Sequence, residues 1–344
     1  MGLSLSTPPQ QQPAPIRARK LAGAAALLLA ATAAAPASAI LADCQKSMVQ
    51  QLTNTFENSQ LNFAFDYCSD INDGRGYTCG VVGFTTSTHD AYDVINTYVN
   101  SGNYSAEFDP YIARLATLNA TGDASTKGLS GFCDAWYAAS SNPTFRAVQI
   151  AKVDSLYYYP SQNISDTLQL TLAAARGQLY DAAIQHGLES DPDSMPSMVA
   201  RVPRTAGMTE DAWLAAFLAE RKRTLCHPST PATQKAWCAS VTRVNSYDHL
   251  TTTGQSNFTD TFNPLDNDGK EITIKCDLNV WTTYIPGNKD QGGSGSGSGM
   301  GKGAVIAIVI IVLIVAAVAG FLAYWRFTKG GWPWANQRFK RVIV

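Results

Sequence analysis

The chain has 344 residues, of which 45% are hydrophobic and 15% charged, a composition typical of a folded protein. Its net charge of −1 hides a segregation: all 27 acidic residues but only 17 of the 26 basic ones lie between Asp43 and Asp290, so this stretch carries −10. Such a segment repels nucleic acid and attracts cationic ligands, although many secreted domains are acidic only for solubility.

The N-terminal residues have the pattern of a targeting segment. Basic residues at 17–20 precede an almost pure Ala/Leu run over 21–35, and small residues at 37–39 supply a cleavage site. This pattern predicts a secretory signal peptide over 1–39, cleaved after Ala39. A membrane anchor is the weaker interpretation, because the run is short and rich in Ala.

Residues 40–289 form the candidate globular unit, and their hydrophobic spacing is mostly helical. A first helix ends next to Glu57, and further helices are expected over 91–99, 168–185 and 211–225. One stretch differs: 77–86 is β-branched and aromatic and follows a turn at 72–74, which predicts a small β element.

All seven cysteines lie between the signal segment and the apolar C-terminal run, in an oxidising compartment where disulfides are expected. Because seven is odd, at least one thiol is free or pairs outside the chain. Cys226 and Cys238 flank a Pro-containing loop and are a plausible local bridge; the other connectivities stay open. No zinc-type spacing occurs, so no metal site is expected. Four glycosylation sequons fit a secreted surface: Asn103, Asn119, Asn163 and Asn257.

The C-terminal part has the pattern of a membrane anchor. A Gly/Ser-rich linker over 290–303 precedes 22 uncharged apolar residues at 304–325, long enough to span a bilayer of ~30 Å. The tail 326–344 is basic, and the positive-inside rule places it in the cytoplasm. We therefore expect a type I membrane protein with 40–289 outside the cell; a GPI signal would end in its hydrophobic tail.

Two carboxylates in the globular unit suggest hydrolytic chemistry. Glycoside hydrolysis needs one carboxylic acid to protonate the leaving oxygen and one carboxylate to activate water or attack the sugar. Glu57 at a helix end and Asp73 in the turn suit opposite walls of a cleft. From residue types alone, surface charge is clearly the better explanation of such a pair.

The local sequence carries more information. Residues 57–90 read ENSQLNFAFDYCSDINDGRGYTCGVVGFTTSTHD. This stretch resembles the chitosanases of glycoside hydrolase family 46, whose signature is Glu-Asn-Ser followed by Asp-Ile-Gly-Asp-Gly-Arg-Gly-Tyr-Thr and Gly-Phe. Residues 70–78 match eight of the nine signature positions, and Gly83-Phe84 follows. The resemblance covers roughly 45–250 and implies a mainly α, two-lobed, lysozyme-like α+β domain with a small sheet at the cleft.

The resemblance also implies roles by position. Glu57 falls on the general acid, Asp73 on the general base and Thr78 on the residue that helps to hold the attacking water. Three further positions fall on the substrate-binding cleft: Tyr67, Arg75 and Asp90. A structural ion pair explains Arg75 equally well, and Asp90 also suits the N-terminal cap of the 91–99 helix.

Later patches extend the resemblance. GQLYDAAIQHG at 177–187, FLAERK at 217–222 and TRV at 242–244 look like family motifs. By position they imply a supporting charge network behind the acid: Asp181, Arg221 and Arg243. Cations there would hold and tune a carboxyl that must donate a proton, although buried ion pairs also simply support a fold.

Three residues depart from the family pattern, each where glycine is usual: Asn72, Ser87 and His89. They stiffen the loop and add side chains to the cleft wall, which bears on subsite specificity. We therefore expect an endo-acting, inverting chitosanase that needs no cofactor and has a monomeric catalytic domain. The alternatives are a carbohydrate-binding or adhesion protein on the same scaffold, and a hydrolase of another amino-sugar polymer. The expected partners are chitosan or a related polysaccharide and the membrane, not nucleic acid.

Overall fold

The computed structural model of the chain describes residues 41–59, 61 and 63–279. Among these residues, none of the helices has the length and apolar character that a bilayer crossing requires. The predicted signal peptide, membrane span and cytoplasmic tail lie outside them.

The described residues are mainly helical, as expected, with two small antiparallel sheets. The helices are α1 (Asp43–Asn58), α2 (Asp90–Val99), α3 (Ile112–Thr121), α4 (Phe132–Ser140), α5 (Pro143–Val153), η1 (Asp154–Tyr158), α6 (Tyr159–Thr167), α7 (Ala173–His186), α8 (Met195–Arg201), α9 (Glu210–Cys226), η2 (Pro231–Thr233), α10 (Gln234–Ala239) and α11 (Thr242–Thr252). The strands are β1 (Cys68–Asp70), β2 (Tyr77–Cys79), β3 (Phe84–Thr85), β4 (Thr261–Phe262) and β5 (Ile274–Lys275).

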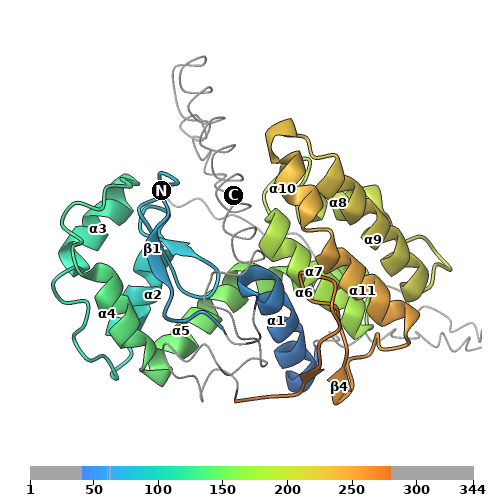
Figure 1. Cartoon of the computed structure of the whole chain (residues 1–344), viewed down its shortest axis with the longest axis horizontal. Helices are drawn as coiled ribbons and strands as arrows, with labels where there is room; N and C mark the ends of the chain where they lie inside the picture. Colours follow the sequence, from blue (N-terminus) through green and yellow to red (C-terminus); the bar gives the residue numbers. More distant parts are fainter. Residues whose placement is uncertain (1–40, 60, 62, 280–344) are drawn as a thin grey trace, which may run out of the picture. The chain divides into compact units, whose positions relative to one another are not determined.

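The elements fall into two groups that face α1 (Figure 1). One group contains the β1-β2-β3 sheet, against which α4 packs, together with α2 and α3. The other contains α7, α8, α9, α10 and α11, which pack on one another. Helix α5 packs on α2 in the first group, while α6 packs on α7 in the second. The continuous segment 143–167 therefore connects the two groups, and its middle turn, η1, is a π-helix.

Helix α1 is buried along most of its length because it lies within the core. Met48, Val49 and Leu52 are fully buried, and Phe56 is nearly so. The helix ends at Ser59, which adopts a left-handed conformation with φ 55°. A disulfide between Cys44 and Cys276 ties the start of α1 to the residue after β5. Glu57 therefore lies on the last turn of a helix that is held by packing and by a covalent bond.

Most of the predicted elements form, and one boundary is wrong. The helices expected over 91–99 and 211–225 are α2 and α9, and the β element over 77–86 comprises β2 and β3. The helix expected over 168–185 begins only at Ala173. Gln169 has a φ of 54°, a left-handed conformation that ends the preceding helix α6, so 168–172 is a connection although its apolar residues continue the helical spacing.

The cysteine pairing agrees with the odd count. Cys226 and Cys238 form the expected local disulfide, and Cys68 pairs with Cys133. Cys79 is a free, buried thiol.

Candidate active site

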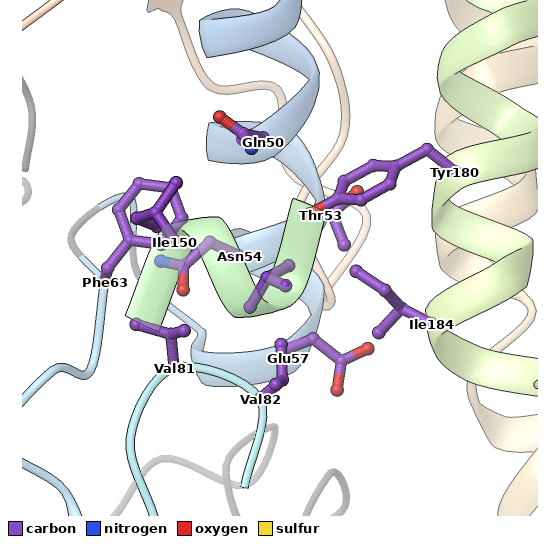
Figure 2. Close-up of a pocket in the computed structure, with 11 residues that line it drawn as sticks. Gln50, Thr53, Asn54, Glu57, Phe63, Val81, Val82, Ile150, Tyr180 and Ile184 are labelled. Carbon is purple, nitrogen blue, oxygen red and sulfur yellow. The ribbon is translucent and has the colours of Figure 1, made fainter. Parts of the chain in front are cut away.

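Glu57 lies at a cavity between α1, α5, α7 and the loop that joins β2 to β3. Four polar residues of α1 reach this cavity because they recur every three or four positions along the helix. Its empty volume of about 300 Å³ includes space that is open to solvent. The lining residues are Gln50, Thr53, Asn54, Glu57, Phe63, Val81, Val82, Ile150, Val153, Tyr180 and Ile184. Figure 2 shows the Glu57 carboxylate directed away from Val81 and towards the side on which Ile184 lies.

One oxygen of Glu57 is held by an arginine from α11. Arg243 Nη2 lies 2.8 Å from Glu57 Oε1 and 2.7 Å from Asp181 Oδ1, while Arg243 Nε donates to Asp181 Oδ2 at 3.0 Å. The Arg243 guanidinium also lies over the Phe56 ring, 5.3 Å from its centroid, which adds a cation–π contact. Glu57 retains 16% of its side-chain exposure. The glutamate is thus fixed on one side and reaches solvent on the other.

Asp181 is completely buried between two arginines. Arg221 Nη1 approaches Asp181 Oδ2 at 2.7 Å, and Arg221 also donates to Gln185 Oε1 at 2.5 Å. Burial alone would raise the pKa of Asp181, but Arg243 and Arg221 outweigh it and hold that pKa below its usual range. The structure therefore brings together the three residues that sequence reasoning assigned to a charge network, and it connects them to Glu57 through Arg243.

Asp73 occupies a tight turn between β1 and β2. Its Oδ1 accepts from the Arg75 backbone N–H at 3.0 Å, which closes the turn. Gly76 follows with a φ of 76°, and a Cβ at that position would collide with Thr86 Oγ1. Thr86 Oγ1 in turn accepts from the Tyr77 backbone N–H at 3.1 Å. The glycine is required because the chain must pass this hydroxyl before it enters β2.

The Asp73 carboxylate is paired with Arg75. Arg75 Nε and Nη2 lie 3.0 and 2.8 Å from Asp73 Oδ2, and the Asp73 side chain is 0% exposed. The alternative interpretation of Arg75 as an ion-pair partner therefore holds, and its partner is the candidate base itself. Asp73 is not among the residues that line the cavity at Glu57. The guanidinium covers this carboxylate.

Thr78 and Tyr67 lie close to the Asp73 turn. Thr78 is buried in β2, and its Oγ1 has no hydrogen-bond partner among the described residues. Tyr67 precedes β1, and its carbonyl accepts from Gly80 N at 2.8 Å. Burial, followed by the negative charges of Cys79 and Asp73, raises the pKa of the Tyr67 phenol.

Asp90 joins the sheet to α2. Its Oδ1 accepts from Thr85 N and Ala91 N, both at 2.9 Å, and from Thr88 Oγ1 at 2.7 Å. Burial raises the pKa of Asp90, while these hydrogen bonds and the Arg75 charge oppose the rise. The cap expected at Asp90 lies one residue earlier, at His89, so Asp90 is the first helical residue.

The departures from glycine do not displace Asp90. Asn72 and His89 adopt left-handed backbone conformations, with φ 56° and 76°, which suit the glycine usual at these positions of the family. The His89 ring is hydrogen-bonded to Asn119 Oδ1.

Sequence reasoning missed two residues of this region, Tyr157 and Glu189. Tyr157 is half-buried in the π-helix η1. Burial raises the pKa of its phenol to about 12, helped by the negative charges of Asp90, Glu189 and Glu57. Charged groups from several elements therefore act on one phenol. A π-turn inside a helix often marks a functional site, but the hydrophobic period does not reveal it.

Glu189 follows the C-terminus of α7. It is exposed, and its Oε2 accepts from Leu188 N at 3.0 Å. Tyr180 and Ile184 of α7 line the cavity, and Glu189 lies three residues beyond His186, the last residue of that helix. Its only signal in the sequence was a carboxylate two residues after Gly187, the last residue of the family-like motif at 177–187.

The chain is similar to known proteins over the residues that form this site. The model of glycosyl hydrolase family 46 matches residues 51–260. A chitosanase of Bacillus subtilis is 38% identical over 209 residues, which are 58% of this chain and 74% of the relative. A Streptomyces chitosanase is 32% identical over 191 residues, which are 52% of this chain and 66% of the relative. The chain belongs to glycosyl hydrolase family 46 and is a glycoside hydrolase.

Solved structures show the same fold. Native chitosanase from Bacillus subtilis MY002 superposes with a TM-score of 0.59 at 34% identity, over 68% of this chain and all of that one. A mutant of that enzyme was solved in complex with six GlcN units, with the same scores and coverage. A Gynuella sunshinyii chitosanase of this family, in complex with chitotetraose, has a TM-score of 0.58 at 33% identity, over 68% of this chain and 98% of that one.

Proposed function

We propose that the protein hydrolyses β-1,4 bonds within chitosan chains by an inverting mechanism, with Glu57 as the general acid and Asp73 as the general base. Glu57 protonates the glycosidic oxygen, and Asp73 removes a proton from the attacking water. Thr78 holds that water, while Tyr67, Arg75 and Asp90 contact the sugar chain. The relatives and solved neighbours that carry the name chitosanase support this substrate.

The observation that carries the proposal is the attachment of Glu57. Arg243 holds Oε1 at 2.8 Å, whereas the remaining exposure of the side chain leaves the carboxyl open to a substrate. An acid catalyst needs this combination of fixed orientation and access to the leaving oxygen.

Asp73 must become available for its task. In the structure Arg75 covers the Asp73 carboxylate with two contacts of 2.8 and 3.0 Å. We propose that substrate binding draws Arg75 towards the sugar and exposes Asp73 to the water. Inversion also requires the two carboxyl groups to lie ~6.5–9.5 Å apart, whereas retention requires ~5–5.5 Å.

Charge supports a cationic substrate. The acidic stretch carries a net charge of −10, and the negative charges of Asp90, Glu189 and Glu57 together raise the pKa of Tyr157. Chitosan is a polymer of glucosamine whose ammonium groups pair with carboxylates. The negative field therefore increases encounter with this substrate and disfavours polyanions.

Glu57→Gln tests the assignment. The substitution keeps the size of the side chain and a hydrogen-bond acceptor for Arg243, but it removes the proton that reaches the leaving group. We expect kcat on soluble chitosan to fall by about 10²–10⁴-fold with binding retained, measured by reducing-end release and by calorimetry. Glu271→Gln is the matched control, because Glu271 is exposed and its ion-pair partner among the described residues is His249. Retained turnover in Glu57→Gln would refute the proposal.

The stereochemistry of the first product tests the mechanism separately. NMR of fresh hydrolysate should show the α-anomer first, since an inverting enzyme converts a β bond directly. A β-anomer would indicate retention. Wild-type protein that binds chitosan without releasing reducing ends would support the adhesion alternative. Faster cleavage of chitin or peptidoglycan than of chitosan would move the substrate to another amino-sugar polymer.

We also propose that the hydrolase acts outside the cell while tethered by residues 304–325. The support is in the sequence: a signal-like segment over 1–39 and an uncharged apolar run followed by a basic tail. Three sequons, at Asn103, Asn163 and Asn257, have exposed asparagines, and Asn119 is half-buried. The full chain should partition into detergent and be released by cleavage within 290–303. A soluble full chain would contradict the tether and leave the enzymatic proposal intact.

A further inference from the structure

Three cysteine sulfurs lie together under the small sheet. Cys68 and Cys133 are joined in a disulfide, and Cys79 is a free thiol. The Sγ atoms of all three lie within 4.8 Å of one another. No other group of three or more His, Cys, Asp or Glu side chains among the described residues places its ligand atoms so close together.

The sheet register places Cys79 directly opposite Cys68. The pairs between β1 and β2 are Cys68 with Cys79, Ser69 with Thr78 and Asp70 with Tyr77. Gly80 N donates to the Tyr67 carbonyl at 2.8 Å, so the next pair along, Cys68 with Cys79, is a non-hydrogen-bonded pair. Such pairs have Cα atoms about 4.5 Å apart, inside the range of about 4.4–6.8 Å that a disulfide spans.

We infer that Cys79 is the attacking thiol of an internal disulfide exchange, which transfers the bond of Cys68 from Cys133 to Cys79. The Cys79 thiolate forms a bond to Cys68 Sγ, the Cys68–Cys133 bond breaks, and Cys133 leaves as a thiolate that takes up a proton. The proton lost by Cys79 goes to solvent. One disulfide and one thiol are present before and after, so no oxidant or reductant is required.

Burial of Cys79 suppresses this exchange in the folded chain. Cys79 is 0% exposed, and burial, together with the nearby charge of Asp90, raises the pKa of its thiol well above the usual range. Because only the thiolate attacks a disulfide, exchange requires alkaline pH or a local opening of the sheet. The chain therefore contains a thiol that is protonated and unreactive while buried, next to the disulfide that it attacks once it is deprotonated.

Exchange would change what the disulfide holds. Cys133 is in α4, so the present bond ties that helix to β1 over a sequence separation of 65. The alternative bond ties β1 to β2, next to Thr78, and leaves α4 held to the sheet by non-covalent contacts, such as the hydrogen bond from Trp136 Nε1 to the Phe65 carbonyl. Alkaline pH would then loosen α4 while stiffening the two strands on either side of the Asp73 turn. This inference does not depend on the proposed function.

Trypsin places the three cysteines on separate peptides, because it cleaves after five basic residues that flank them: Lys46, Arg75, Arg114, Lys127 and Arg146. Cys68 lies on peptide 47–75, Cys79 on 76–114 and Cys133 on 128–146. The full chain is incubated without oxidant or reductant in steps from about pH 7 to 10, around the ordinary thiol pKa of about 8.5. It is then quenched in acid, alkylated, digested and mapped by mass spectrometry.

We expect peptide 47–75 linked to 128–146 at the start, with growing linkage of 47–75 to 76–114 as the pH rises. Cys79→Ser should keep the first linkage throughout. The inference is overturned if Cys79 becomes alkylatable while the first linkage stays complete. Linkage of 76–114 to 128–146 would also overturn it, because Cys133 would then be the sulfur attacked.

Cys133→Ser provides a second test that needs no alkaline step. Secreted through an oxidising compartment, this variant should contain 47–75 linked to 76–114. If it accumulates with Cys68 and Cys79 both alkylatable, the cross-strand bond does not form and the inference fails. If the variant is not secreted, the alkaline series on the wild-type chain decides.

Discussion

Arg243 connects Glu57 to Asp181: the same Nη2 atom lies 2.8 Å from Glu57 Oε1 and 2.7 Å from Asp181 Oδ1. The candidate acid at the end of α1 is thereby coupled to a carboxylate buried in α7, through an arginine of α11. Two consequences of this coupling can be measured, at Arg243 and at Asp181, and two further predictions concern Thr78 and Glu189.

Arg243→Lys should slow catalysis through Glu57. A lysine carries a single ammonium and cannot hold two carboxylates with a planar fork. The loss of one charge-assisted hydrogen bond, about 1.5–3 kcal/mol, corresponds to a fall in kcat of about 10–100-fold. The decisive comparison is the double variant with Glu57→Gln, which should be no slower than Glu57→Gln alone. If the two substitutions lower kcat independently in the double variant, Arg243 acts on catalysis through a group other than Glu57.

Asp181→Asn should destabilise the protein in a pH-dependent way. It leaves two buried arginines without their carboxylate, which costs about 3–5 kcal/mol of unfolding free energy at neutral pH. The pKa of Asp181 is lower in the folded chain than its unfolded value of about 3.9, so its contribution is complete above that pH and is lost as the pH falls through the lower folded value.

Urea unfolding at pH 7 and near pH 3 measures this effect, and the gap between wild type and Asp181→Asn should narrow in acid. Glu220→Gln is a comparison at a more exposed site, where Arg223 and Arg201 lower the pKa of Glu220 to about 2 against a smaller opposing effect of burial. Its expected loss is about 1 kcal/mol or less. Equal losses of unfolding free energy for the two variants would indicate that the buried network contributes no more to stability than the more exposed ion pairs of Glu220.

Thr78→Val should reduce kcat without reducing stability. Thr78 Oγ1 has no protein partner among the described residues, so removing it costs the fold nothing, whereas a water that it holds would lose one hydrogen bond. We expect kcat to fall by roughly tenfold with an unchanged melting temperature. Thr86→Val is the control in the same sheet region, because Thr86 Oγ1 accepts from Tyr77 N and its loss should cost about 1–3 kcal/mol. A lower melting temperature for Thr78→Val with unchanged kcat would assign Thr78 a structural role.

Glu189→Gln should raise KM for fully deacetylated chitosan and leave kcat unchanged. An exposed ion pair contributes about 0.2–1 kcal/mol, so the rise is at most about fivefold. Added salt should abolish the difference from wild type because it screens exposed charges. Glu271→Gln removes one equivalent exposed charge, and an equal effect of both variants would indicate a general field and not a contact.

Local patterns predicted the parts of the site that are local. The apolar spacing of α1 ends beside Glu57, and the Asn-Asp-Gly turn leads into the strand that contains Thr78. The cover of Asp73 by Arg75 was foreseen only as one of two interpretations of the arginine. Which carboxylate pairs with Arg75 depends on the directions of the side chains within the turn, and hydrophobic periodicity does not specify those directions.

Longer-range features were less predictable. The helical spacing of 168–172 continues across a real break, because Gln169 adopts a left-handed backbone that its residue type does not require. Tyr157 lies in a π-turn, which the hydrophobic period does not reveal. An odd cysteine count required one sulfur that is free or pairs outside the chain, but the count did not identify that sulfur as Cys79.

The disulfide between Cys44 and Cys276 has a sequence separation of 232 and encloses every residue assigned to the site. A protease that cuts any single connection inside this ring produces two fragments that stay covalently joined. The nicked enzyme therefore dissociates only after the disulfide is also reduced, which favours persistence wherever proteases are abundant and reducing agents scarce.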